Sequence, residues 1–211
     1  MGEDLADAAR HWDARYAERD RVWSGDPNVM LVREMAGLPA GRALDLGCGE
    51  GADAVWLAGR GWRVTAVDVS EVALERAAAR AVEAGVGGLV EWQRRDLGVS
   101  FPPGVFDLVS AHFLHSYAEL PRERILRWGA AAVAPGGVLL VVGHAGPPPW
   151  EAEARPGVSL PTPGEVLAGL DLSPGGWEVE VCEEYERVQL GPDGRPGTRV
   201  DNVLRVRRLP G

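Results

Sequence analysis

The sequence predicts an α/β fold built on a mostly parallel sheet, and two observations support this. From about residue 43 onward, short apolar runs alternate with longer helical stretches, which is the pattern of a parallel sheet wrapped by helices. The last third of the chain changes to two β-rich runs around a turn of glycine and proline, which is typical of an antiparallel hairpin. One domain accounts for the whole chain, because 211 residues are enough to build one substantial core.

The individual elements follow from the apolar runs and their boundaries. The expected parallel strands are 43–46, 62–67, 89–93, 106–111 and 138–142, each short and apolar like strands that are covered on both faces. The expected helices are 52–58, 71–84 and 120–133, with Ser70 as the N-cap of the second. Residues 134–137, Ala-Pro-Gly-Gly, are expected to end the third helix and turn the chain into the next strand.

Both ends of the chain carry further elements. Near the N-terminus, five residues recur at helical spacing and mark one apolar face of a helix: Leu5, Ala8, Ala9, Trp12 and Tyr16. Near the C-terminus, the runs 177–190 and 199–207 flank the turn 191–197 and predict the hairpin. Residues 145–163 form a proline-rich segment longer than the roughly 12 to 15 residues of ordinary connections, so we expect a lid or a binding loop there.

The composition excludes several classes of protein. The net charge of −9 provides no sequence-wide positive field for nucleic acid, and no lysine is present to form a Schiff base or a Walker A site. The two cysteines lack the paired spacing of a zinc site or a disulfide framework, so we expect free thiols. No apolar run approaches the roughly 18 residues of a membrane span, and the first twenty residues do not resemble a signal peptide. We therefore expect a cytoplasmic protein without nucleic-acid or membrane partners, and the sequence indicates no oligomeric state.

Residues 47–51, Gly-Cys-Gly-Glu-Gly, form a glycine turn between a predicted strand and a predicted helix. Glycines allow positive φ and let a ligand approach the backbone, and the helix start favours an anionic group such as an amino-acid carboxylate. The turn alone fits two cofactors, since Gly47, Gly49 and Ala52 also satisfy the dinucleotide fingerprint G-x-G-x-x-G/A. We interpret Cys48 as a packing residue, because this position favours a small side chain.

Acidic residues around the turn favour one of the two cofactors. Asp45 is a charged residue at the end of an apolar strand, a costly position unless a cationic or hydrogen-bonding group meets it, and the amino group of a methionine would do so. Glu50 in the turn would repel a pyrophosphate, which argues against a nicotinamide dinucleotide. Asp68 ends the following strand, where its carboxylate can accept hydrogen bonds from both hydroxyls of a ribose.

A further acid, Asp96, comes just after the third predicted strand. It is placed to accept a hydrogen bond from an adenine amino group, while the backbone N–H of Leu97 could meet a ring nitrogen. The spacing gives equal weight to a second interpretation, in which Asp96 is a solvated loop residue or a helix cap.

Five motifs in order closely resemble those of class I S-adenosylmethionine-dependent methyltransferases, and they are residues 44–49, Asp68, Asp96, 106–109 and 134–137. The resemblance covers roughly residues 41–144. It implies a Rossmann-like three-layer sandwich with a seven-stranded, mostly parallel sheet and an antiparallel last strand. It also implies S-adenosylmethionine as cofactor and S-adenosylhomocysteine as product.

Residues 11–16 and 23–28 resemble the entry segment of the tellurite-resistance and thiopurine methyltransferase-like subgroup. In those relatives this segment closes over the cofactor, which implies that Tyr16 and Trp23 contact the methionine moiety or the sulfonium. An aromatic face beside a ligand cation contributes roughly 0.5 to 2 kcal/mol, so such contacts are physically reasonable.

The resemblance implies an organisation of the chain and a cofactor site. Residues 1–211 are expected to form one domain, in which 1–40 cover the cofactor, 41–144 bind it, and 145–211 supply a substrate-side loop and the terminal hairpin. The expected cofactor-binding residues are Tyr16, Trp23, Asp45, Gly47, Cys48, Gly49, Asp68, Val69, Asp96, Leu97 and Ala111.

Methyl transfer from a sulfonium is an in-line displacement with a neutral leaving group, so alignment supplies much of the acceleration and a general base is optional. His112, His115 and His144 follow the fourth and fifth predicted strands, at the edge where open α/β sheets bind ligands. We expect His115 and His144, with Tyr117 as a neighbouring hydroxyl, to act as base or to orient the acceptor. In the competing interpretation these histidines cap strand ends or hydrogen-bond within loops.

Three hypotheses for the function follow. The leading one is methyl transfer to a small-molecule acceptor through S, O, N or a chalcogen oxyanion. It requires no metal, because the acidic pair of magnesium-dependent catechol-type enzymes is missing. The second is a nicotinamide-dependent oxidoreductase, motivated by Gly47, Gly49, Ala52 and Asp68. The third is a non-catalytic module that binds S-adenosylmethionine for regulation.

Overall fold

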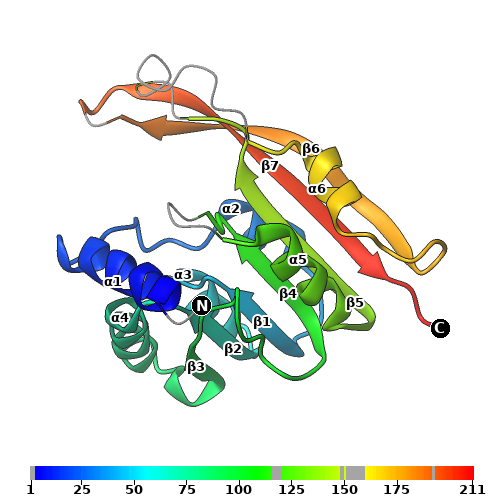
Figure 1. The fold of residues 1–211 in the computed structure, drawn as a ribbon, viewed down its shortest axis with the longest axis horizontal. Coiled ribbons are helices and arrows are strands. Elements are labelled where there is room, and N and C mark those ends of the chain that lie inside the picture. The colour runs from blue at the N-terminus through cyan, green and yellow to red at the C-terminus, as the bar shows by residue number, and fades with distance from the viewer. Residues whose placement is uncertain (1–2, 116–119, 148–149, 151–159, 192) are drawn as a thin grey trace.

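The structure is a computed structural model that describes residues 3–115, 120–147, 150, 160–191 and 193–211 (Figure 1). Seven strands form one sheet in the order β3-β2-β1-β4-β5-β7-β6. The strands are β1 (Arg42–Leu46), β2 (Arg63–Asp68), β3 (Val90–Arg94), β4 (Phe106–His112), β5 (Val133–His144), β6 (Trp177–Leu190) and β7 (Pro196–Arg208).

The pairing of these strands confirms the predicted fold class. Strands β1 to β5 pair in parallel, whereas β7 runs antiparallel to both β5 and β6. The order reverses between β1 and β4, because β2 and β3 lie on one side of β1 and the later strands on the other. Ligands of open α/β sheets bind at such a switch point, outside the carboxyl ends of the strands.

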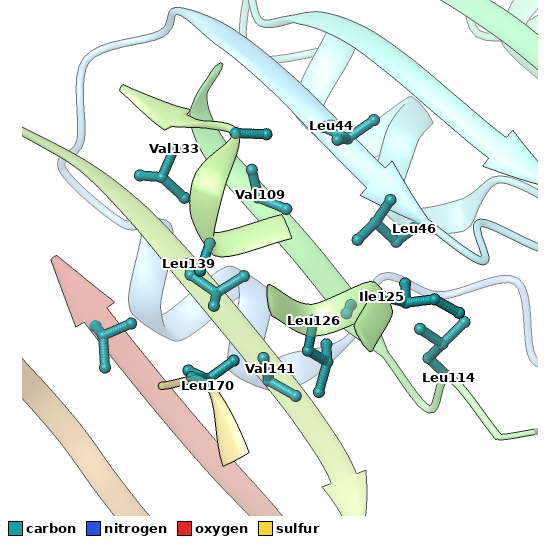
Figure 2. Packing of buried hydrophobic residues seen from close by; sticks show 14 of the residues in the cluster. Leu44, Leu46, Val109, Leu114, Ile125, Leu126, Val133, Leu139, Val141 and Leu170 are labelled. Carbon is teal, nitrogen blue, oxygen red and sulfur yellow. The ribbon is translucent and has the colours of Figure 1, made fainter. Parts of the chain in front are cut away.

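Helices cover both faces of the sheet and bury two apolar clusters. On one face lie α2 (Val29–Met35) and α3 (Ala52–Ala58), which enclose a cluster with alternate residues of β1, β2, β4 and β5. Helix α3 itself contacts β1, β2 and β3. On the other face lie α5 (Arg122–Ala131), which packs on β4 and β5, and α6 (Pro163–Gly169), which lies beside α5 on β6 and β7. Figure 2 shows Ile125 and Leu126 of α5 among the buried residues of this face. Helix α4 (Glu71–Glu83) lies beside α3, and Figure 1 shows α1 (Glu3–Ala17) next to α4; a short 3-10 helix, η1 (Gly87–Leu89), precedes β3.

Several predicted boundaries and elements are wrong, for physical reasons that the structure makes clear. Helix α5 spans Arg122–Ala131 instead of 120–133, and β5 begins at Val133 instead of 138, because Val133 already pairs with Phe106. Residues 134–137 therefore lie inside the strand, at an irregularity in register where Gly136 has φ of +80°.

Two short helices were not predicted. Helix α2 is capped by the side chain of Asn28, which accepts a hydrogen bond from the N–H of Met30. Helix α6 follows a capping box, in which Thr162 accepts from the N–H of Glu165 while the Glu165 carboxylate accepts from the N–H of Thr162. The described part of the proline-rich segment 145–163 thus leads directly into a helix.

The glycine turn depends on close packing beneath it. Gly51 has φ of +77°, and a Cβ at this position would lie 2.7 Å from both the Ala77 Cβ and the Trp92 ring. Gly85, at the end of α4, has a similar φ of +72° with no atom within 4 Å of the corresponding point. Alanine substitutions at the two glycines therefore separate the cost of a left-handed backbone from the cost of a steric clash.

We expect Gly51→Ala to destabilise the protein by several kcal/mol, because a methyl group there adds a clash to the unfavourable φ. Gly85→Ala is the matched control and should cost only the roughly 1–2 kcal/mol of left-handed backbone. Chemical denaturation of both variants measures the difference. Equal losses would contradict close packing of α4 and β3 under the turn.

Candidate functional site

The glycine turn lies at the carboxyl end of β1, and two side chains cover it. A Cβ on Gly49 would lie 2.9 Å from the hydroxyl of Tyr16, and one on Gly47 would lie 2.7 Å from Leu114. Tyr16 is buried, and its hydroxyl accepts a hydrogen bond of 3.1 Å from the Trp23 indole, which is half exposed. Burial, with a smaller effect of the Asp68 carboxylate, raises the pKa of Tyr16, so its hydroxyl stays protonated. Tyr16 and Trp23 thus lie together at the turn, and their contact with the methionine moiety stays a prediction.

Asp45 is buried at the end of β1, and only half of its carboxylate is satisfied. Its Oδ1 accepts a hydrogen bond of 3.0 Å from the hydroxyl of Ser110, its register partner on β4. Its Oδ2 is buried and has no hydrogen-bond partner among the described residues. Burial, reinforced by the nearby carboxylate of Asp53, raises the pKa of Asp45 to about 7. A cationic donor at Oδ2 would satisfy this oxygen and favour the charged form.

Asp68, at the end of β2, is tied to the turn and to the next helix. Its Oδ2 accepts from the N–H of Gly49 at 2.8 Å, and its Oδ1 accepts from the N–H of Ser70 at 2.9 Å. Burial raises the pKa of Asp68. A carboxylate has about four acceptor positions, so two remain for further donors. The neighbouring Val69 is half-buried, and its carbonyl accepts from Arg94.

Asp96 follows β3 and stabilises its own loop. Its Oδ1 accepts from the N–H of Gly98 at 2.6 Å, which supports the turn-capping interpretation that the spacing left open. Leu97 is buried in the cluster of the α5 face. Whether Asp96 also meets a ligand stays a prediction.

A second pair, of a buried histidine and a partly buried aspartate, is absent from the predicted catalytic residues and lies near Asp45. His112, at the end of β4, places its Nδ1 2.7 Å from Oδ2 of Asp53 in α3. The other oxygen of Asp53 accepts from the N–H of Asn28 at 2.6 Å. The Nε2 of His112 is buried and has no hydrogen-bond partner among the described residues. Residues 53 and 112 are too far apart in the chain for spacing to reveal the pair.

Glu50 has a role different from the one its position suggests. Its carboxylate accepts from the backbone N–H groups of Val22 and Trp23 at 3.1 to 3.3 Å and forms an ion pair of 3.0 Å with Arg76. Because this charge is paired, the predicted repulsion of a pyrophosphate by Glu50 is not supported. Glu50 instead fastens the chain after α1 to the glycine turn.

Asp13 gives the same N-terminal segment a second attachment. Its carboxylate accepts from the hydroxyl of Ser70 at 2.6 Å and from the N–H of Val72 at 3.3 Å. Ser70 is also the N-cap of α4, where its side chain accepts from the N–H of Ala73. Helix α1 is therefore fixed to the residue that also binds Asp68.

His115 and His144 are brought together, as their positions after β4 and β5 predict. Their rings stack at 5.7 Å, and the ring of Phe113, a non-glycine residue with φ of +50°, stacks on His144 at 4.2 Å. Nδ1 of His144 lies 2.8 Å from Asp201. Burial, reinforced by the charge of Arg122, lowers the pKa of His115 to about 4, and burial also lowers that of His144. Both rings are thus neutral near pH 7, and His115 is a weak base.

The remaining predicted residues are placed as follows. Ala111 is fully buried in β4, and Cys48 lies within the turn, where burial raises the pKa of its thiol and keeps it protonated. Tyr117 lies outside the described residues. Both cysteines are free thiols. Among the described residues no group of three or more His, Cys, Asp or Glu side chains could hold a metal ion, and no helix is long and apolar enough to cross a bilayer.

Comparisons with known proteins agree with this geometry. Residues 43–137 match the family described as "Methyltransferase domain". Over 116 residues, the chain is 40% identical to the "Ribosomal RNA small subunit methyltransferase C" of Chromohalobacter salexigens. The aligned region covers 52% of this chain and 33% of that protein. The chain spans 33% to 61% of the length of the first curated relatives that it matches.

Solved structures match over most of the chain. The structure named "Conversion of a Disulfide Bond into a Thioacetal Group during Echinomycin Biosynthesis" has a TM-score of 0.70 and 28% identity, and covers 95% of this chain and 93% of that one. The N-methyltransferase NodS of Bradyrhizobium japonicum in complex with S-adenosylhomocysteine has a TM-score of 0.69 at 20% identity. The match covers 95% of this chain and 98% of the NodS chain, and it shows that the fold is shared. The comparisons agree with the predicted resemblance: residues 43–137 match a methyltransferase domain, and the solved structures share the fold.

The buried carboxyl of Asp45 predicts a measurable pH dependence of stability. Its pKa is about 7 in the folded protein and roughly 3.9 in the unfolded chain, so the folded state holds the proton more tightly. This favours folding below about pH 4, and the advantage is lost as the pH rises to 7. We expect Asp45→Asn to raise the melting temperature at pH 8 by several degrees and to flatten its pH dependence between 4 and 7.

Thermal unfolding followed from pH 4 to pH 8 tests this expectation. Asp107→Asn is the matched control, because Asp107 accepts from the N–H of Arg42 at 2.8 Å at the opposite end of the same strands. An unchanged pH profile in Asp45→Asn would show that Asp45 is not the buried titrating group.

Proposed function

Taking residues 43–137 as a methyltransferase domain, we propose that the whole chain is one such domain and transfers a methyl group from S-adenosylmethionine to a small-molecule acceptor. The observation that carries this proposal is the unpartnered Oδ2 of Asp45 at the glycine turn. A buried carboxylate oxygen without a donor is costly unless a ligand supplies one. The α-ammonium group of the methionine moiety is a donor of the required charge.

The charges around the turn support the choice of cofactor. Burial and the carboxylates of Asp53 and Asp68 raise the pKa of Asp45, whereas His112 and the hydrogen bond from Ser110 lower it. Three carboxylates therefore lie near the same edge of the sheet. A negative edge attracts the ammonium and the sulfonium of S-adenosylmethionine and repels the pyrophosphate of a dinucleotide. This argument replaces the one from Glu50, whose charge is paired with Arg76.

The other predicted contacts follow from where each element ends. Asp68 retains acceptor capacity for the ribose hydroxyls, with Val69 beside it. Asp96 and the N–H of Leu97 are proposed for the adenine, at the end of the adjacent strand β3. The methionine moiety is proposed to lie along the backbone of Gly47, Cys48, Gly49 and Ala111.

Tyr16 and Trp23 are proposed to face the sulfonium from the N-terminal side. Tyr16 already lies over Gly49, and its hydrogen bond to Trp23 keeps the two aromatic rings together. A Cβ at Gly49 would meet the Tyr16 hydroxyl at 2.9 Å, so this hydroxyl lies directly over the turn. Residues 3–40 are therefore proposed to cover the bound cofactor.

When bound, S-adenosylmethionine supplies an electrophilic methyl group, and the chain has to align an acceptor with it. His115 and His144 are proposed to orient the acceptor, with Tyr117 as a third member. Their lowered pKa values disfavour removal of a proton from a weakly acidic acceptor near pH 7. The lowered pKa values therefore favour an acceptor that is already nucleophilic, such as a thiolate or a chalcogen oxyanion, over a neutral alcohol.

We further propose a cytoplasmic enzyme that acts without nucleic acid, membrane or metal. The net charge of −9 and the negative sheet edge oppose an RNA or DNA substrate, and the free thiols fit a reducing compartment.

Turnover tests the proposed activity. The protein is incubated with S-adenosylmethionine and a panel of thiols, phenols, amines and oxyanions of selenium and tellurium, and methylated products are detected by mass spectrometry. We expect a methylated product from the soft acceptors first. Binding of the cofactor with no product from any acceptor would support the non-catalytic module instead.

Asp68→Ala tests the proposed ribose contact. We expect the affinity for S-adenosylhomocysteine to fall about tenfold or more, because hydrogen bonds to a charged acceptor are lost. Calorimetric titration measures it, with Asp107→Ala as a control that removes an aspartate bonded to a backbone N–H at the far end of the sheet. An affinity unchanged by Asp68→Ala would place the ribose elsewhere.

A further inference from the structure

The buried His112 and the partly buried Asp53 form a pair that the contacts proposed above leave without a role. Asp53 is held by two bonds, one from the N–H of Asn28 at 2.6 Å and one shared with Nδ1 of His112 at 2.7 Å. A carboxylate can only accept hydrogen bonds, so in the neutral imidazole the proton lies on Nδ1. The lone pair on Nε2 is then an acceptor, and it is buried without a partner among the described residues.

This lone pair belongs to the same cluster as the unpartnered oxygen of Asp45. Ser110 and His112 are two residues apart on β4 and therefore point to the same face of the sheet. Asp45 on β1 pairs in register with Ser110 and accepts its hydroxyl. One face of two adjacent strands thus presents two buried acceptors, Asp45 Oδ2 and His112 Nε2, and neither has a donor within the described residues.

The chemistry of the two acceptors defines the group that fits them. Two unpartnered acceptors beside carboxylates call for a group with several N–H donors and a positive charge, and an ammonium has three such donors. Both atoms are enclosed, which favours a small donor group such as an ammonium.

We propose that His112 Nε2, with its tautomer fixed by Asp53, is a second ligand of the α-ammonium group of the bound cofactor alongside Asp45. This inference rests on the proposed function, since it assigns a residue to the same cofactor site. It makes His112 a binding residue and Asp53 a positioning residue. Asn28 then links the start of α2 to cofactor recognition through Asp53.

A ligand pair that differs only at the amino group tests the proposal. Calorimetric titration compares S-adenosylhomocysteine with its analogue in which hydrogen replaces the α-amino group. The wild type should bind the amino ligand at least roughly tenfold more tightly. In His112→Phe, which keeps a buried ring but removes the acceptor, the ratio should fall severalfold, while the affinity for the des-amino ligand should stay near that of the wild type.

Two further variants guard against a structural explanation. His112→Gln retains an acceptor and should recover part of the ratio. Val142→Ala alters the packing at the register partner of His112 without removing an acceptor, so it should leave the ratio at the wild-type value. The ¹⁵N shift of Nε2 in the wild type should move when S-adenosylhomocysteine binds and move less with the des-amino ligand.

The outcomes separate this inference from the function on which it rests. If wild-type protein binds neither ligand, the proposed cofactor site is wrong. If it binds S-adenosylhomocysteine but His112→Phe lowers both affinities equally or leaves the ratio unchanged, His112 does not contact the ammonium. Unchanged affinities with lost turnover in His112→Phe would also overturn the inference and assign the ring to catalysis.

Discussion

The site depends on one costly feature, the carboxylate of Asp45 held in the protein interior at the end of β1. Its only described hydrogen-bond donor is the hydroxyl of Ser110, and burial raises its pKa to about 7. Neighbouring carboxylates increase this cost. Such an arrangement persists in a folded protein when a ligand supplies the missing partner, and it selects ligands by charge. The glycine turn beside it provides room for that ligand but does not determine which ligand binds.

The acids around the turn also attach the N-terminal segment. Glu50 accepts from the backbone of Val22 and Trp23, Asp53 accepts from the backbone of Asn28, and Asp68 shares Ser70 with Asp13. Each attachment joins the cover to a residue that lies in or next to the turn. Cofactor binding and the position of residues 3–28 are therefore coupled physically, through bonds made by the same few acids.

Sequence reasoning recovered the elements whose signals are local. The parallel strands, α3 and the Ser70 cap of α4 follow from apolar runs and cap residues, and the structure places them close to their predicted bounds. It missed α2, which is too short for clear periodicity, and α6, although Thr162 and Glu165 carry the spacing of a capping box. The start of β5 was misplaced because its first residue is fixed by pairing with Phe106, a long-range contact.

In the candidate site, too, the residues with a local signal could be predicted and the long-range contacts could not. Asp45 and Asp68 were singled out because a charged residue at the end of an apolar strand is conspicuous in the sequence. The partners of Glu50 and of His112 could not be predicted, because they are distant in the sequence. The partners of Glu50 lie 26 to 28 positions away, and Asp53 lies 59 positions from His112. Roles that depend on such contacts become visible only when the fold is known.

The central claim is that the buried acidic edge at the glycine turn selects a cofactor that carries an α-ammonium group and no pyrophosphate. Calorimetric titration of the wild-type protein with S-adenosylhomocysteine, NADH and NADPH tests it most directly. Saturable binding of S-adenosylhomocysteine, with no binding of either dinucleotide, is the predicted result. Saturable binding of NADH or NADPH without binding of S-adenosylhomocysteine would contradict the claim.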